Sequence, residues 1–358
     1  MSAEAMPVEG RVFHTLDALR GIAALGVVTF HMSLAFGSLT ATSGYLAVDL
    51  FFMMSGVVLS HAYEPRFRSG MGVYGFMRAR LIRLYPLYLV GIVLGFAVTL
   101  ASLFGRNTQG WDAASLARAT LLSLLFLPDL TRQPVDQLFP LNVPCWSLFL
   151  ELLVNLLFVI CWPALTSRFL LIVCALTGTA VAIAAGIIGH LDVGSTAGTL
   201  AIGLVRTVFG FSVGVLIARH VPHERVRVGN VAVLLILVVV GVVIAGRPAA
   251  ISRAAWDSTC ALVVLPVVVA FGTRVDPGAQ LRRVATFLGV TSYAVYVFHS
   301  PLAAVMNSAT RVFNRAGAIV EPPLLGLVIV VVLLVSCWLV DRYFDIPARR
   351  RLARAVPR

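Results

Sequence analysis

Two ionisable side chains, Arg20 and His31, share the apolar stretch LDALRGIAALGVVTFHM and lie eleven residues apart. On a helix this spacing is about 20° past three full turns, so both side chains occupy one face, about 16 Å apart along the axis. Ionisable groups inside a membrane helix are costly and usually functional. The pair therefore indicates a path along this helix, from a cation near its cytoplasmic end to a titratable imidazole in its outer half. Equally simply, Arg20 could reach lipid phosphates and His31 could be a hydrogen-bonded core histidine.

Three further ionisable residues fall in apolar stretches: Asp49 in GYLAVDLFFMMSG, Glu151 in PCWSLFLELLVN and His299 in TSYAVYVFHSPL. The expected topology puts them at a depth similar to that of His31. Two imidazoles and two carboxylates are the groups that general acid–base chemistry uses, with a carboxylate orienting an imidazole. Each residue alone could be structural, and Asp49 could simply cap a helix. The four together predict a reaction centre.

Arginines cluster at the start of the third apolar stretch, where RARLIRLYPLY contains Arg78, Arg80 and Arg83. The guanidinium fork suits phosphate groups. The alternative is that these side chains set the membrane topology and contact lipid headgroups. Arg206 lies in the middle of another apolar stretch and must face the bundle or a cavity, where a structural ion pair is the simplest expectation.

The elements that position these residues follow from composition. Of the 358 residues, 59% are hydrophobic and only 12% are charged, whereas an ordinary soluble chain is about 25% charged. The chain is therefore predicted to be an all-α polytopic membrane bundle, and soluble, disulfide-framework and disordered classes are excluded. The net charge of +12 comes from arginines in short loops, which indicates membrane topology rather than nucleic-acid binding. The five cysteines form no C-x-x-C pair, and the pair His220 and His223 lacks further ligands, so no metal site is expected.

About ten transmembrane helices are expected, because a span needs about 20 apolar residues. They are 16–36, 44–63, 84–103, 145–166, 168–189, 197–218, 228–246, 254–272, 284–308 and 321–343. The apolar stretch 116–127 is too short and could be a span, a re-entrant segment or a surface helix. If it does not cross, the arginines outside the spans number 19 on the inner side and 7 on the outer side. The positive-inside rule then puts both termini in the cytoplasm.

This topology divides the chain into three parts. They are a cytoplasmic N-terminal segment (1–15), a membrane-embedded domain (16–345) and a basic cytoplasmic tail (346–358). The beginning MSAEAMPVEG is acidic, unlike the basic start of a signal peptide, so no cleavage is expected. No appended soluble domain and no internal repeat are expected, so an inverted-repeat transporter has no positive support.

Five blocks of the sequence, in this order, resemble those of the membrane acyltransferase 3 family. They are LDALRGIAALGVVTFHM, GYLAVDLFFMMSG, RARLIRLYPLY, WSLFLE and TSYAVYVFHSPL. Each block alone is weak, but together they span residues 16–301. The chain departs from the family where an aromatic pair usually follows the glutamate and Val154 and Asn155 stand instead. That departure bears on the type of acceptor more than on the chemistry.

The resemblance implies a bacterial inner-membrane O-acyltransferase of the exopolysaccharide or O-antigen type. Such proteins move an acyl group, usually acetyl, from cytoplasmic acetyl-CoA to a hydroxyl of an extracytoplasmic glycan or glycolipid. His31 would be the catalytic histidine, acting as general base or acyl carrier, and Arg20 its essential partner toward the donor. The other assignments by motif are catalytic roles for Glu151 and Asp49, donor binding by Arg78 and Arg83, and substrate binding by His299, Trp146 and Tyr293.

Two other functions fit the same residues. Intramembrane His, Asp, Glu and Arg also make proton relays, so a proton-coupled transporter would show substrate flux without consuming acyl-CoA. A catalytically inactive scaffold of the same fold would bind the donor and release no CoA.

Overall fold

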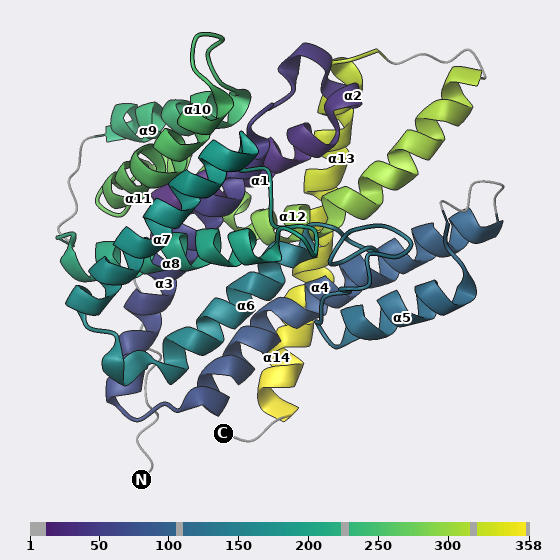
Figure 1. Ribbon diagram of the computed structural model, residues 1–358. Helices are drawn as coiled ribbons and strands as arrows, with labels where there is room; N and C mark the ends of the chain where they lie inside the picture. The colour runs from purple at the N-terminus through teal and green to yellow at the C-terminus, as the bar shows by residue number, and fades with distance from the viewer. Residues whose placement is uncertain (1–11, 105–109, 223–228, 316–320, 356–358) are drawn as a thin grey trace.

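The computed structural model describes residues 12–104, 110–222, 229–315 and 321–355, and within these ranges it consists of helices and connecting loops, without strands. This confirms the predicted all-α membrane bundle (Figure 1). The α-helices are α1 (His14–His31), α2 (Ser33–Phe36), α3 (Ala47–Arg68), α4 (Val73–Phe104), α5 (Ala113–Leu124), α6 (Cys145–Ile160), α7 (Ser167–Ile188), α8 (Leu200–His220), α9 (Gly229–Ala245), α10 (Arg253–Thr259), α11 (Leu265–Gly272), α12 (Ala279–Arg315), α13 (Leu324–Val340) and α14 (Ile346–Ala355).

Each of the ten predicted spans overlaps one of these helices or a consecutive pair. Among the described residues, seven helices are long and apolar enough to cross a membrane, and α1 with α2 makes an eighth if the bent pair is one span. Helices α6 and α9, with 16 and 17 residues, are shorter than the predicted spans. The count of ten and the cytoplasmic side of the termini stay predictions. Residues 1–11 of the predicted N-terminal segment and 356–358 of the predicted tail lie outside the described residues.

The first predicted span is broken rather than straight. Helix α1 ends at His31, Met32 leaves helical geometry, and α2 continues at an angle of 97°. The predicted catalytic histidine therefore lies at the end of a helix, where the chain turns, and not inside a continuous span. Arg20 lies in the straight part of α1.

The centre of the bundle is built by α1 packed on α12, α3 and α9, and by α3 packed on α8. Helices α3 and α8 approach so closely that their backbones touch at two glycines. A Cβ atom at Gly56 would overlap the carbonyl oxygen of Phe211, and one at Gly214 would overlap that of Met53. Small residues permit such contact between membrane helices, where dispersion forces rather than water exclusion hold helices together. This contact fixes the relative position of the two helices that carry Asp49 and Arg206.

The short stretch predicted at 116–127 forms α5, a helix of 12 residues that lies beside α4 (Figure 1). Its length of about 18 Å cannot cross a hydrocarbon core of about 30 Å. Tyr88 and Tyr85 on α4 donate hydrogen bonds to the carbonyls of Ser123 and Leu124, at 2.7 and 2.8 Å. Helix α5 is thus held against α4 through the carbonyls of its last turn.

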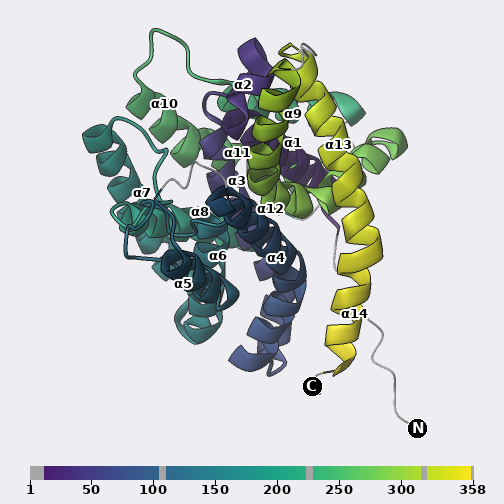
Figure 2. The same ribbon diagram turned by 90° about the vertical axis from the view of Figure 1, so that its right-hand side faces the viewer.

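The chain ends in one long rod, in which α13 continues through a π-helical turn, Asp341–Asp345, into α14 (Figure 2). Helix α14 packs against the beginning of α4. Arg78 on α4 donates to the carbonyl of Ala353 at 3.1 Å. The basic segment predicted as a tail is therefore helical through Ala355.

Candidate active site

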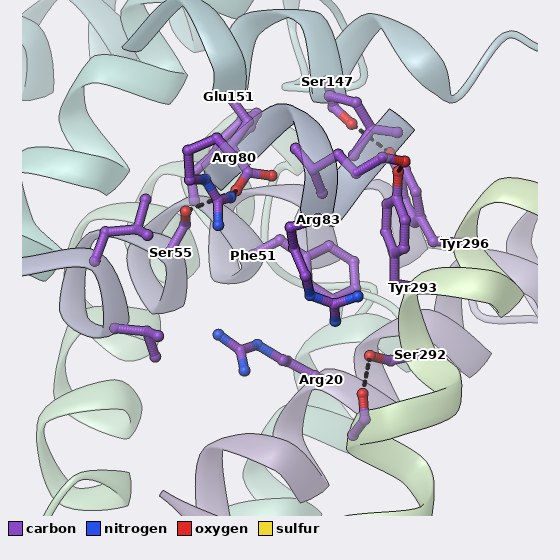
Figure 3. Close-up of a pocket in the computed structure, with 16 residues that line it drawn as sticks. Arg20, Phe51, Ser55, Arg80, Arg83, Ser147, Glu151, Ser292, Tyr293 and Tyr296 are labelled. Atoms are coloured by element: carbon purple, nitrogen blue, oxygen red, sulfur yellow. Dashed lines mark hydrogen bonds and ion pairs between the residues drawn. The ribbon is translucent and has the colours of Figure 1, made fainter. Parts of the chain in front are cut away.

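A cavity of about 210 Å³ lies among α1, α3, α4, α6 and α12, and its lining includes three arginines (Figure 3). The guanidinium groups of Arg20, Arg80 and Arg83 converge on it, whereas Glu151 is the single acidic residue in its lining. We call it the arginine cavity. Its lining comprises Arg20, Phe51, Phe52, Ser55, Val58, Leu59, Arg80, Arg83, Leu84, Ser147, Leu148, Glu151, Gly289, Ser292, Tyr293 and Tyr296. The described lining carries three positive charges and one negative charge, while Asp17 and Asp345, which pair with Arg20 and Arg83, lie outside it. A lining of this charge favours an anionic ligand.

Glu151 is held by two neighbours rather than poised for proton transfer to a histidine. Arg80 contacts its carboxylate at 2.9 Å, and the Ser55 hydroxyl donates to the same oxygen at 2.8 Å. Arg80 and Glu151 are only 13% and 17% exposed, so the pair is largely shielded. The carboxylate therefore neutralises and orients Arg80. The RARLIRLYPLY block contains Arg80, but its resemblance to the family assigns donor binding to Arg78 and Arg83 alone.

The other two arginines of the cavity have looser partners. Arg83 lies 3.7 Å from Asp345 of the π-helical turn and covers the ring of Tyr293, while Arg20 lies 3.4 Å from Asp17. Their side chains are 41% and 27% exposed, so both can bind a ligand without losing a tight internal contact. The predicted pair Arg78 and Arg83 separates here, because Arg83 lines the cavity and Arg78 does not.

A second, smaller cavity of about 60 Å³ lies beyond Tyr296 and contains His31, and we call it the histidine cavity. It is small beside typical ligand pockets of about 300–1,000 Å³. Its walls come from α1, α8, α12, the beginnings of α3 and α6, and the loop between α7 and α8. The lining residues are Val27, Phe30, His31, Tyr45, Val48, Val143, Pro144, Trp146, Asp192, Val193, Ser195, Arg206 and Tyr296.

The rings of His31 and His299 face each other with centroids 5.1 Å apart. The Nδ1 atom of His31 lies 3.0 Å from the Val27 carbonyl, and that of His299 lies 2.8 Å from the Tyr296 carbonyl. Because a carbonyl only accepts, both Nδ1 atoms carry the proton when the rings are neutral, which leaves each Nε2 as a lone-pair acceptor. The Nε2 of His299 is buried and has no partner among the described residues. Backbone carbonyls thus set the tautomer that base chemistry needs.

Neither predicted carboxylate orients His31, and this corrects the sequence interpretation. Asp49 instead binds Arg206 through two contacts, 3.1 and 2.7 Å long, with the two side chains 4% and 1% exposed. Arg206 also donates to the carbonyl of Val193 at 2.6 Å. The default expectation of a structural ion pair for Arg206 is confirmed. Of the four residues predicted to converge, the structure brings together His31 and His299, whereas Asp49 and Glu151 each bind an arginine.

Tyr296 separates the two cavities and lines both. Its hydroxyl lies 2.6 Å from the Ser147 hydroxyl and donates to the Pro144 carbonyl at 3.2 Å. Its ring also contacts Phe51 on one side and His299 on the other. A group that moves directly from the arginine cavity into the histidine cavity would pass this side chain. Tyr296 is the second tyrosine of the TSYAVYVFHSPL block, and its position three residues before His299 could have marked it.

The two other predicted substrate-binding residues lie in different cavities. Trp146 lines the histidine cavity, and its ring packs on Gly194, where any larger residue would collide with it. Tyr293 lines the arginine cavity and donates to the Leu84 carbonyl at 2.7 Å. Trp146 is therefore placed to contact a group beside His31, and Tyr293 a group beside the arginines.

A loop of residues 125–144 lies next to the loop between α7 and α8. Leu138 donates its N–H to the Ser195 carbonyl at 2.8 Å, which ties the two loops together. Asp129 holds the first loop through Thr131 and Arg118. Burial alone would raise the pKa of Asp129, but the hydrogen bonds from Thr131 and Arg118 outweigh it and hold the pKa below its ordinary value. The wall of the histidine cavity is thus built from fixed loops. Within the described ranges, no group of three or more His, Cys, Asp or Glu residues could hold a metal ion.

Comparison with known proteins agrees with this geometry. The family model described as "Acyltransferase domain" (acyltransferase family 3) matches residues 13–342. The chain therefore belongs to this family and is a membrane acyltransferase. A protein of Rhizobium radiobacter, named "Protein 2 in picA locus", is 38% identical over 181 residues, which are 48% of this chain and 94% of the relative. No solved structure gives a significant match.

Proposed function

We propose that this membrane acyltransferase moves an acetyl group from acetyl-CoA, bound from the cytoplasm, to a hydroxyl of an extracytoplasmic glycan or glycolipid. It would act as a multi-pass protein of the cytoplasmic membrane. The observation that carries the proposal is the meeting of two unlike cavities at Tyr296, one lined by three arginines and the other by His31. An acyltransferase that takes its donor and acceptor from opposite sides needs such a pair.

The arginine cavity would hold the phosphates of CoA. Guanidinium groups bind phosphate through paired, charge-assisted hydrogen bonds. Arg20 and Arg83 are the groups with the most freedom to do this, since Arg80 is already bound to Glu151. Arg20 and His31 lie on the same helix, so the thioester would extend along α1 from the phosphates toward the imidazole.

In the proposed reaction, His31 is the general base. Its Nε2 takes the proton of the acceptor hydroxyl while the hydroxyl oxygen bonds to the thioester carbonyl carbon. The carbon–sulfur bond then breaks, and the CoA sulfur receives the proton from His31, so the products are an acetyl ester and the CoA thiol. In a covalent variant, Nε2 itself first accepts the acetyl group as the carbon–sulfur bond breaks and releases the CoA thiolate. The acceptor hydroxyl then takes the acetyl group from Nε2, and its proton passes to the thiolate. Acetyl-protein trapped with acetyl-CoA and no acceptor would favour the covalent variant.

The transporter alternative loses support from the same contacts. The relay predicted from the sequence used Asp49 and Glu151, and each of these two carboxylates binds an arginine instead of a histidine.

The test uses membranes that contain the wild type, His31→Ala or His220→Ala, with radiolabelled acetyl-CoA and envelope glycan fractions of the host. His220 is the matched control, since it is exposed and contacts Ser167 far from both cavities. We expect CoA release and labelled glycan with the wild type and His220→Ala, and a loss of roughly 10²- to 10⁴-fold with His31→Ala. Full activity in His31→Ala would contradict the mechanism. Binding of acetyl-CoA without CoA release in the wild type would favour the inactive scaffold, and flux without acetyl-CoA consumption would favour the transporter.

A further inference from the structure

Among the described residues that line the histidine cavity, Asp192 is the acidic one, and no sequence motif pointed to it. It lies in the loop between α7 and α8, lines the histidine cavity and is exposed. Within the described residues, its carboxylate oxygens form no hydrogen bond or salt bridge, unlike those of Asp49 and Glu151. An accessible carboxylate without a partner beside the histidine can accept a hydrogen bond from a ligand.

The backbone on both sides of Asp192 is fixed by buried charged side chains. The N–H of Leu191 donates to the Asp257 carboxylate at 2.8 Å, and the carbonyl of Val193 accepts from Arg206 at 2.6 Å. Asp257 and Arg206 are 0% and 1% exposed. These two contacts fix the backbone that carries Asp192 at one place in the cavity wall.

The chemistry of the surrounding walls defines the ligand. A carboxylate only accepts hydrogen bonds, so it selects a donor such as a hydroxyl and repels the phosphates of CoA. Trp146 and Tyr45 supply aromatic surface next to it. The Tyr45 hydroxyl is fixed by Asp257, at 2.9 Å, so the ring stays in place. Aromatic surface beside an accepting carboxylate suits a ring that carries neighbouring hydroxyls.

We propose that Asp192 binds the acceptor, by accepting a hydrogen bond from the hydroxyl next to the one that is acylated at His31. This inference rests on the proposed function and assigns the acceptor subsite within it. The loss of this contact should weaken acceptor binding and leave donor binding unchanged, because the arginine cavity lies on the other side of Tyr296.

The experiment compares wild type, Asp192→Asn and Asp136→Asn, with methyl hexopyranosides and their monodeoxy analogues as acceptor probes. Asp136 is an exposed aspartate on the neighbouring loop, outside the cavity lining. For Asp192→Asn we expect the acceptor KM to rise roughly ten- to hundredfold with the donor KM unchanged. For the deoxy analogue that lacks the bound hydroxyl, the acceptor KM of the wild type should rise by the same factor. The acceptor KM of Asp192→Asn should not rise further with this analogue. Asp136→Asn should behave as the wild type.

Several outcomes would overturn the assignment. An acceptor KM that is unchanged in Asp192→Asn, or a loss confined to kcat, would assign Asp192 to the charge of His31 and not to the acceptor. Equal sensitivity of both proteins to every deoxy analogue would also exclude the contact, as would the absence of transfer to any methyl hexopyranoside while host glycan is acetylated. A wild type that acetylates neither probe nor glycan would remove the proposed function itself.

Discussion

The arginine cavity and the histidine cavity share Tyr296 and differ in almost everything else. The arginine cavity is larger, about 210 against 60 Å³, and its walls include long side chains that remain partly exposed. The walls of the histidine cavity are fixed by buried groups, with Arg206 and Asp257 each bound to the loop that carries Asp192. Flexible positive charge suits the capture of a large anion, and fixed walls suit a reaction that needs defined geometry. The difference indicates that the arginine cavity is suited to binding and the histidine cavity to the reaction.

The largest effect on stability is expected from the ion pair that fixes the wall of the histidine cavity. Asp49→Asn leaves the Arg206 guanidinium buried without its counter-charge, and such a loss costs about 3–5 kcal/mol. We expect a clear fall in the thermal unfolding temperature in detergent. Glu151→Gln is the matched change in the arginine cavity, where the pair is more exposed, and it should cost less. Equal falls in the unfolding temperature of both variants would show that the two cavities do not differ in how firmly their walls are held.

Donor capture should depend on which arginine is removed. Arg83→Gln should raise the donor KM about tenfold, because Arg83 lines the arginine cavity and a charge-assisted contact to phosphate is lost. Arg78→Gln, on the same helix but outside the lining, should leave the donor KM unchanged. Initial rates at varied acetyl-CoA measure both values. A rise with Arg78→Gln and none with Arg83→Gln would place the donor elsewhere.

The barrier between the cavities can be removed at Tyr296. Tyr296→Ala should join the two cavities and admit water to the thioester, so CoA release without acceptor should rise several-fold. Tyr296→Phe keeps the ring and loses only the contacts to Ser147 and Pro144, so it should stay near wild type. CoA release measured with a thiol reagent distinguishes them. No increase with Tyr296→Ala would mean that the ring does not keep the cavities apart.

The smallest effect is expected in the loop beside the histidine cavity. Asp129→Asn weakens the contacts to Arg118 and Thr131, which together stabilise the loop by about 1 kcal/mol. Because the pKa of Asp129 is lowered in the folded protein, this stabilisation is complete above about pH 4 and disappears as the pH falls through the lower folded value. The difference in unfolding temperature between wild type and variant should therefore be constant from pH 6 to 8. A difference that varies in that range would point to another titrating group.

The sequence predicted the helices well, because a chain with 59% hydrophobic residues must satisfy its backbone internally in the membrane. It did not predict the 97° turn after His31, since no proline or glycine marks the break at Met32. Nor could it pair Asp49 with Arg206, which are 157 residues apart, because helix contacts decide such partners. Asp192 belongs to no motif, and only the fold brings its loop to His31.

The separation of binding from chemistry is tested most directly by two measurements on His31→Gln and Arg83→Gln. One is the equilibrium Kd for acetyl-CoA, and the other is the rate of acetyl transfer at saturating donor. We expect His31→Gln to bind acetyl-CoA as the wild type does and to transfer almost nothing. We expect Arg83→Gln to bind it more weakly and to transfer normally once saturated. Loss of donor binding in His31→Gln, or a loss of saturated rate in Arg83→Gln as large as that in His31→Gln, would contradict two cavities with separate tasks.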